Sequence, residues 1–482
     1  MSPIPFKRLF AQTLISAFLS FSTFFIGFLR VYFFSKNLSM EEFGALSLLL
    51  TFSAFLMYVF TLGTYQFLFK SVNEGIERTS SAFWASLTVT ILISLVFIIT
   101  IILFNNSISK WLNLSLFKRE LVLTITGTAT TAVMTLFLFY HYGLGKNNFQ
   151  NFLQFLRGSL WVIISVFFSF FLKLTLLQVL VVFNLCMCII LLIAFPWKEW
   201  NLLFPFKVDK DAFGRLFKYC IPLLPYFAGV WGIPLIVRTQ LNIYDGAKYV
   251  AIFSVAYTLM EIVFMFISTI TATLSPYFFE EQTDGDKPAL FYNIMLKYSI
   301  LAIIFIVPFI FMLRYDIIQI VASEKYLVAG DYIPLLIFFP LLRIIIIVFE
   351  QRFLKDGKTL YLGIIYSVGI SLSFLFAIFL IPYYSVYGAI YSSLGSYAFI
   401  FICLLIRQRG MIDFVYLNLW GLLKITLILT FTVVILNFFD FSNFLKVIPL
   451  SMVTLLSLFL SSVLTKKEKE KIFSLIKIKN RN

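Results

Sequence analysis

Long apolar runs follow one another along almost the whole of this chain, and they constrain its fold more than any other feature of the sequence. A helix that crosses the ~30 Å hydrocarbon core of a membrane needs about 20 mostly apolar residues. Of the 482 residues, 61% are hydrophobic and only 13% are charged, and the mean hydropathy is +0.96. Water-soluble proteins of this length do not have such a composition. The sequence therefore predicts an all-α polytopic membrane protein.

Apolar runs bounded by charged or turn-forming residues predict about fourteen membrane-spanning helices. Their approximate bounds are 10–35, 43–69, 80–104, 118–143, 149–172, 175–197, 213–241, 247–278, 289–313, 331–353, 359–381, 386–406, 417–437 and 444–464. The first run is too long for the apolar part of a signal peptide and lacks a small-residue cleavage site. We therefore expect it to remain in the protein as the first span.

The placement of basic residues predicts the orientation of the chain. With the N-terminus inside, about two thirds of the 38 Lys and Arg residues fall in segments that face the cytoplasm. Both termini are therefore expected to be cytoplasmic. The net charge of +15 then requires no nucleic-acid partner, because basic loops face anionic lipid headgroups.

A faint internal repeat predicts the domain organisation. At an offset of 207 residues, Arg8-Leu9-Phe10 matches Arg215-Leu216-Phe217, and Arg30 and Arg238 end their helices at nearly equivalent points. Parallel repeats of six helices are a common transporter plan. The expected parts are a first lobe at 1–205, a second lobe at 206–410, an extra helix pair at 411–464 and a basic cytoplasmic tail at 465–482.

Polar side chains recur at three- and four-residue steps on several predicted spans, which places them on one face of each helix. Polar groups at membrane depth are costly unless they face protein or water, so these faces predict an interior cavity. The expected lining residues include Gln12, Ser16, Tyr58, Gln154, Trp161 and Thr258. Small polar residues also join helices to one another, so the Ser and Thr positions alone do not establish a cavity.

Charged residues within the spans predict what the cavity would bind. Four of them are arginines, namely Arg30, Arg157, Arg238 and Arg343. The acids are Glu261, inside a span, and Glu350, near a cytoplasmic end. An excess of arginine favours an anion, and the guanidinium fork suits phosphate oxygens. The alternative is structural: Arg343 pairs with Glu350 or Glu261, and Arg30 and Arg238 extend to the lipid headgroups.

Catalytic and metal-binding groups are not recognisable in the sequence. Cys186 and Cys188 fall inside a span, where cysteines serve packing, and the single histidine, His141, is expected at a membrane interface. Walker A, zinc-protease and dinucleotide-binding patterns are missing, so the sequence predicts neither an ATP-driven pump nor an enzyme, and no cofactor. Glu261 and Glu350 are the candidates for coupling to H⁺ or Na⁺.

Several short segments of the sequence together resemble those of a known protein family. They are Lys7-Arg8, Arg30, the run Leu38-Ser-Met-Glu-Glu-Phe-Gly-Ala-Leu-Ser47 and Leu62-Gly63-Thr64, echoed in the second half by 245–254 and 275–280. In this respect the chain resembles Wzx-type polysaccharide (O-antigen) flippases of the multidrug/oligosaccharidyl-lipid/polysaccharide exporter superfamily. Phe43-Gly44 is the best single signal, and its counterpart Val250-Ala251 departs from the usual pair.

The resemblance implies a transporter of a bacterial inner membrane that moves undecaprenyl-pyrophosphate-linked oligosaccharide units by alternating access, for O-antigen or capsule synthesis. Its implied partners are this substrate, membrane lipids, a polysaccharide polymerase and chain-length proteins, and it would act as a monomer. The four arginines would then hold the pyrophosphate. Three alternatives stay open: a multidrug exporter, a flippase for another lipid-linked precursor, and a membrane polysaccharide polymerase.

Overall fold

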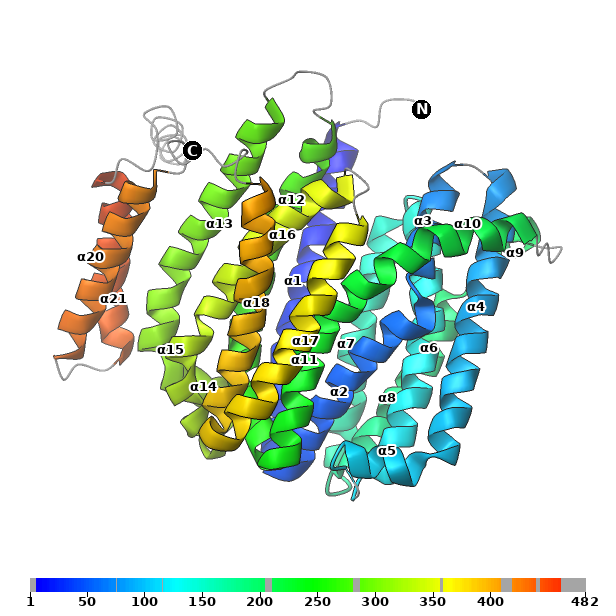
Figure 1. Cartoon of the computed structure of the whole chain (residues 1–482), viewed down its shortest axis with the longest axis horizontal. Coiled ribbons are helices and arrows are strands. Elements are labelled where there is room, and N and C mark those ends of the chain that lie inside the picture. Colours follow the sequence, from blue (N-terminus) through cyan, green and yellow to red (C-terminus); the bar gives the residue numbers. More distant parts are fainter. Residues whose placement is uncertain are drawn as a thin grey trace. The chain divides into compact units, whose positions relative to one another are not determined.

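The computed structural model describes residues 6–74, 76–114, 116–203, 210–280, 287–355, 359–408, 418–438 and 443–460, and these residues are almost entirely helical (Figure 1). Side chains are described for most of them, and the longest gaps in that description are at 6–17 and 265–280. The described residues form two compact units, and each is treated separately below.

Unit 1 comprises 1–255, 321–324 and 358–396. Its helices are α1 (Phe6–Asn37), α2 (Met40–Thr61), α3 (Thr64–Glu74), α4 (Ile76–Leu103), α5 (Asn105–Trp111), α6 (Lys118–Gly143), α7 (Asn147–Ser169), α8 (Leu176–Ala194), η1 (Trp197–Glu199), α9 (Trp200–Leu203), α10 (Lys210–Cys220), η2 (Ile221–Leu223), α11 (Leu224–Tyr244) and α17 (Thr359–Tyr384). The first parts of α12 (Ala247–Glu280) and α18 (Val386–Gln408) also belong to it.

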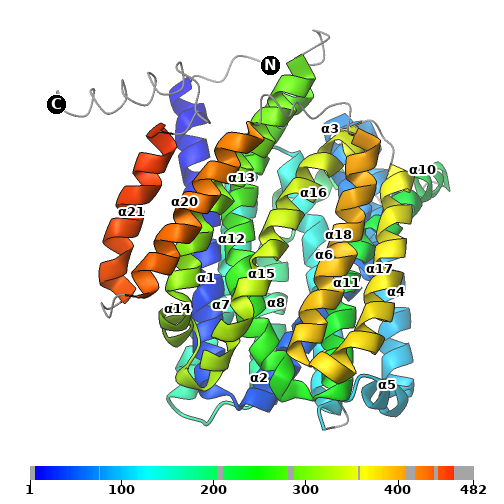
Figure 2. The ribbon, with the colours of Figure 1, turned by 60° about the vertical axis from the view of Figure 1, so that its left-hand side comes forward.

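Unit 2 comprises 256–320, 325–357 and 397–482, and so includes the remainder of α12 and of α18. Its other helices are α13 (Lys287–Met312), α14 (Arg314–Val321), η3 (Glu324–Tyr332), α15 (Ile333–Leu336), α16 (Phe338–Lys355), α20 (Leu419–Asn437) and α21 (Asn443–Leu460). Helices α20 and α21 lie side by side (Figure 2). They pack on α13 through an apolar cluster that includes Leu301, Ile425 and Leu450.

The helices confirm a multi-pass membrane protein. Within the described ranges, ten helices are long and apolar enough to cross a membrane, or eleven if the bent pair 324–336 and 338–353 counts as one span. A described helix, or a run of consecutive short helices, lies at each of the fourteen predicted spans. Glycines allow close packing within unit 1: a Cβ at Gly229 of α11 would lie 2.4 Å from the Cβ of Tyr366 on α17.

Besides the bent pair at 324–336 and 338–353, two predicted spans are interrupted. The span at 43–69 breaks into α2 and α3 at Leu62 and Gly63, whose φ angles are 47° and 77°. The span at 213–241 breaks into α10 and α11 at η2, which contains Pro222. Hydropathy could not locate either break, because apolar residues continue through both of them.

Candidate functional site

The segment before α2 is a structural joint. Ser39 caps the helix by accepting a hydrogen bond from the backbone N–H of Glu42, and the Glu42 carboxylate accepts one in return from the backbone N–H of Ser39. The other carboxylate oxygen of Glu42 accepts a hydrogen bond from the backbone N–H of Leu176, at 3.2 Å. One acid therefore fixes the start of α2 and ties it to the start of α8.

Gly44, one turn further along, allows the closest approach between the starts of α2 and α12. A Cβ at this position would lie 1.8 Å from the carbonyl oxygen of Ala247 and 3.2 Å from the backbone nitrogen of Ala251. Ala251 is the residue that the 207-residue offset aligns with Gly44. The aligned positions of the repeat therefore contact each other, and small residues at both make the contact possible.

Tyr58 organises an aromatic cluster in unit 1. Its ring stacks on Phe227 and Trp231 of α11, with centroid distances of 5.1 and 6.2 Å. The ring of Tyr65 lies 6.3 Å from that of Tyr58, edge to face, and Arg157 of α7 lies within range of electrostatic interaction with Tyr58. Tyr58 and Arg157 are half-buried, so both retain accessible surface. A cation and stacked rings of this kind can bind an anionic, ring-bearing ligand.

Arg30 lies on α1 opposite α7. Its guanidinium carbon is 5.6 Å from the ring centroid of Trp161, within the range of a cation–π interaction. Trp161 is almost fully buried, donates its indole N–H to the carbonyl of Val179 and packs against Phe34 and Phe183. The indole is therefore a rigid support for Arg30.

Arg238 of α11 is buried, with 6% of its surface exposed. It donates hydrogen bonds to the hydroxyl of Ser254 and the carbonyl of Pro234, at 3.3 and 3.4 Å, and its guanidinium lies 5.3 Å from the ring centroid of Phe253. Ser254 and Phe253 belong to α12. This arginine therefore joins α11 to the start of α12 within unit 1, and it is not a snorkelling residue.

Unit 2 holds the fourth arginine. Arg343 of α16 is buried, and its guanidinium lies 5.4 Å from the ring centroid of Phe264 and 5.3 Å from that of Tyr397. Phe339 packs against both of these rings. Arg30, Arg238 and Arg343 thus each have an aromatic ring within cation–π distance, and Arg157 interacts electrostatically with Tyr58.

The other predicted site residues are distributed over both units. Gln154 lies half-buried on α7 of unit 1, whereas Thr258 and Glu261 lie half-buried on α12 of unit 2. Glu350 of α16 is buried, with 2% of its surface exposed. The side chains of Gln12 and Ser16, both on α1, lie outside the described residues.

Sequence reasoning missed two buried lysines of the described residues, Lys446 and Lys297. Lys297 lies on α13, which packs against α16, and only 1% of its surface is exposed. It falls within the predicted span 289–313 but is not among the predicted site residues. Asn293, one turn earlier, is also buried, so the polar pair at an i, i+4 spacing was the signal that could have identified an interior face.

Comparison with known protein families decides the affiliation of the chain. Residues 9–282, more than half of the sequence, match the model of a family described as polysaccharide biosynthesis protein. The chain belongs to this family. No curated protein sequence matches it significantly.

Solved structures show the fold of this family member. The lipid II flippase MurJ, in an inward closed conformation, is 13% identical, with a TM-score of 0.76 over 93% of this chain and 98% of that chain. An inward-facing multidrug resistance MATE family transporter of the MOP superfamily is also 13% identical, with a TM-score of 0.63 over 83% and 95%. The fold is therefore that of the MOP superfamily.

A third solved structure bears on pocket chemistry. A MOP superfamily transporter from Pyrococcus furiosus is 13% identical to this chain, with a TM-score of 0.60 over 82% of this chain and 96% of that chain. Its binding pocket is described as having a reverse polarity that suggests a different function. Proteins of this fold thus differ in the charge of their pockets. The substrate must therefore be inferred from the side chains of the site and not from the fold.

Proposed function

We propose that this protein is a flippase that moves undecaprenyl-pyrophosphate-linked oligosaccharide units across a bacterial cytoplasmic membrane for O-antigen or capsule synthesis. The observation that carries the proposal is that Arg157 and Tyr58 remain accessible beside stacked rings, in a member of a polysaccharide biosynthesis family with a transporter fold. Arginine suits the pyrophosphate, and aromatic faces suit sugars.

In this proposal the chain has fourteen membrane-spanning helices, arranged as two six-helix lobes at 1–205 and 206–410 with an extra pair at 411–464. The contact of Gly44 with Ala247 and Ala251 supports a repeat, because aligned positions meet there. The lobes alternate access to the two sides, and both termini and the tail at 465–482 are cytoplasmic. The protein acts as a monomer and delivers its product to a polysaccharide polymerase and chain-length proteins.

Arg30, Arg157, Arg238 and Arg343 are proposed to hold the pyrophosphate along its path. Gln12, Ser16, Tyr58, Gln154, Trp161 and Thr258 are proposed to line the cavity. Glu261 and Glu350 are the proposed sites of H⁺ or Na⁺ coupling, since acids in a low-dielectric setting respond strongly to a bound cation. The protein transports its substrate without chemical change and needs no cofactor.

A deletion of the gene in its host tests the proposal. We expect lipid-linked oligosaccharide to accumulate in the cytoplasmic leaflet and surface polysaccharide to disappear, with both restored by the wild-type gene on a plasmid. Normal polysaccharide together with altered drug sensitivity would instead identify a multidrug exporter.

A flippase for another lipid-linked precursor is the second candidate, because the lipid II flippase MurJ matches 93% of the chain. The same deletion strain separates the two functions. Accumulated lipid II, with unchanged surface polysaccharide, would support this second candidate and contradict the first.

A further inference from the structure

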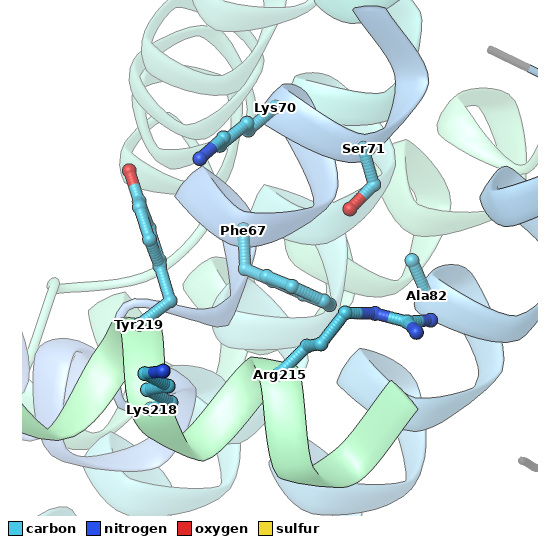
Figure 3. Close-up of a pocket in the computed structure, with 7 residues that line it drawn as sticks. All are labelled: Phe67, Lys70, Ser71, Ala82, Arg215, Lys218 and Tyr219. Carbon is cyan, nitrogen blue, oxygen red and sulfur yellow. The ribbon is translucent and has the colours of Figure 1, made fainter. Parts of the chain in front are cut away.

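A basic pocket lies at one end of unit 1, between α3, α4 and α10 (Figure 3). Its volume is about 310 Å³, and the residues that line it are Phe67, Lys70, Ser71, Ala82, Arg215, Lys218 and Tyr219. Three of these seven residues are cationic and none is acidic. The one acid close by on α10 is Asp211, one turn before Arg215, so positive charge predominates at the pocket.

Packing holds the cations in place. On α10, Ala212, Leu216 and Cys220 are buried at successive turns, which leaves Arg215 and Lys218 on the exposed part of the helix. Helix α10 packs on α3 and α4. We therefore expect the two cations to keep their position relative to the pocket.

Two aromatic rings line the pocket, Phe67 from α3 and Tyr219 from α10. The Nζ of Lys70 on α3 lies 5.4 Å from the ring centroid of Tyr219, and the ring of Tyr219 lies 6.2 Å from that of Phe67. Tyr219 and Arg215 of α10 point toward α3, and Ser71 of α3 points toward α10 (Figure 3). Ser71 adds a buried hydroxyl.

Helix lengths place the pocket at the level of the lipid headgroups. Helix α11, with 21 residues, is about 31 Å long and is sufficient to cross the hydrocarbon core. Because α11 alone is long enough to cross the core, α10, which η2 separates from it, is expected to lie beyond the core. In unit 1, α10 crosses the ends of α3 and α4 (Figure 1).

Aromatic side chains at the same end of unit 1 agree with this level. Trp84 of α4 donates its indole N–H to the carbonyl of Leu203 in α9 and packs against Trp200. Trp197 is 65% exposed, and Ile221, directly after α10, is 59% exposed. Trp is enriched where membrane and water meet, and exposed apolar groups beside basic ones are typical of that interface.

We propose that this pocket binds a phosphate group carried by a membrane lipid. Arg215 supplies a planar fork and the two lysines supply point charges, which together suit phosphate oxygens. Ser71 and Tyr219 offer hydroxyl donors. Two lipids share this chemistry: an anionic phospholipid, and a polyprenyl pyrophosphate, whose relevance rests on the proposed function.

The test uses the purified full-length chain and a triple variant, Lys70→Gln, Arg215→Gln and Lys218→Gln. The matched control is Lys110→Gln, Arg119→Gln and Lys173→Gln. It also removes two lysines and one arginine, but at exposed positions outside the pocket. The probes are phosphatidylglycerol, undecaprenyl pyrophosphate, phosphatidylcholine as the neutral lipid, and inorganic pyrophosphate as the soluble anion. Native mass spectrometry counts bound lipid, and thermal unfolding reports stabilisation.

We expect at least tenfold weaker binding of an anionic lipid to the triple variant at low salt, and less than threefold weakening in the control, because each basic residue near a lipid phosphate contributes substantially to affinity. Weaker binding of both anionic lipids, or of either one alone, supports the site and identifies which lipid supplies the phosphate. Equal affinity of the variant and the wild type for both overturns it. Inorganic pyrophosphate binding as tightly as the lipids also overturns it, in favour of a soluble-anion site.

A double variant, Arg215→Gln with Lys218→Gln, provides a second measurement if the triple variant is produced poorly, since both positions are exposed. It should retain part of the affinity. Export of polysaccharide is assayed separately, in the deletion strain. Normal export in that strain, together with phospholipid binding by the purified wild-type protein, would contradict the proposed function and still support this site.

Discussion

At the scale of single residues, Arg157 distinguishes a binding site from structural support. Its guanidinium is half-buried near Tyr58, whereas Arg238 is buried and hydrogen-bonded within the protein. We expect Arg157→Ala to reduce glycan export at least tenfold with a normal protein level, and Arg157→Lys to retain part of it, because lysine keeps the charge and loses the fork. Surface polysaccharide in the deletion strain is the measurement.

The matched control for Arg157 is Arg119→Ala, at an exposed position at the start of α6. Its export should equal that of the wild type. Full export by Arg157→Ala, at a protein level equal to that of the control, would remove Arg157 from the proposed site.

Gly44 gives a prediction about stability. The Cβ of alanine would lie 1.8 Å from a backbone oxygen of α12, and backbone cannot yield as a flexible side chain can. We expect Gly44→Ala to destabilise the protein by about 1–3 kcal/mol or more, as over-packing does. Thermal unfolding in detergent measures the effect. Gly27→Ala is the control, since nothing lies within 4 Å of a Cβ there, and an unchanged melting temperature for Gly44→Ala would contradict the close contact.

Lys297 and Glu350 provide a further residue-scale prediction. Both are buried in unit 2, on helices that pack against each other, and buried charges persist where they compensate one another. We expect Lys297→Met and Glu350→Gln each to lower thermal stability, and the double variant to be more stable than additivity predicts. Strictly additive losses would show that the two residues are energetically independent.

At the scale of elements, the C-terminal pair α20 and α21 is predicted to be dispensable for folding. Removal of the pair uncovers the apolar face of α13 to lipid, which is as apolar as the side chains it replaces. A chain truncated after Gln408 should therefore insert and elute as a monodisperse species in size-exclusion chromatography. Aggregation of this truncated chain, with the full-length protein monodisperse, would contradict the prediction.

At the scale of the whole molecule, the sequence predicted where helices lie better than where they bend. Twenty-residue apolar windows locate spans because the membrane requires that length. The break at Leu62 depends on a leucine with positive φ, and that at Pro222 on a short 3-10 turn, and neither changes hydropathy. Pairings such as Glu42 with Leu176, or Arg343 with Tyr397, join residues far apart in the sequence, so no local pattern could reveal them.

Membrane orientation is the property on which both the proposed function and the basic pocket depend, because the proposed substrate would reach the protein from the cytoplasmic side. The excess of Lys and Arg predicts that the loop at Lys173 faces outward and that Lys210, at the start of α10, faces the cytoplasm. Both residues are exposed. In a variant with all four cysteines replaced, Lys173→Cys should react with a membrane-impermeant maleimide in intact cells. Lys210→Cys should react only after permeabilisation. The reverse pattern would place the basic pocket on the outer leaflet, where it could not receive a lipid from the cytoplasmic side.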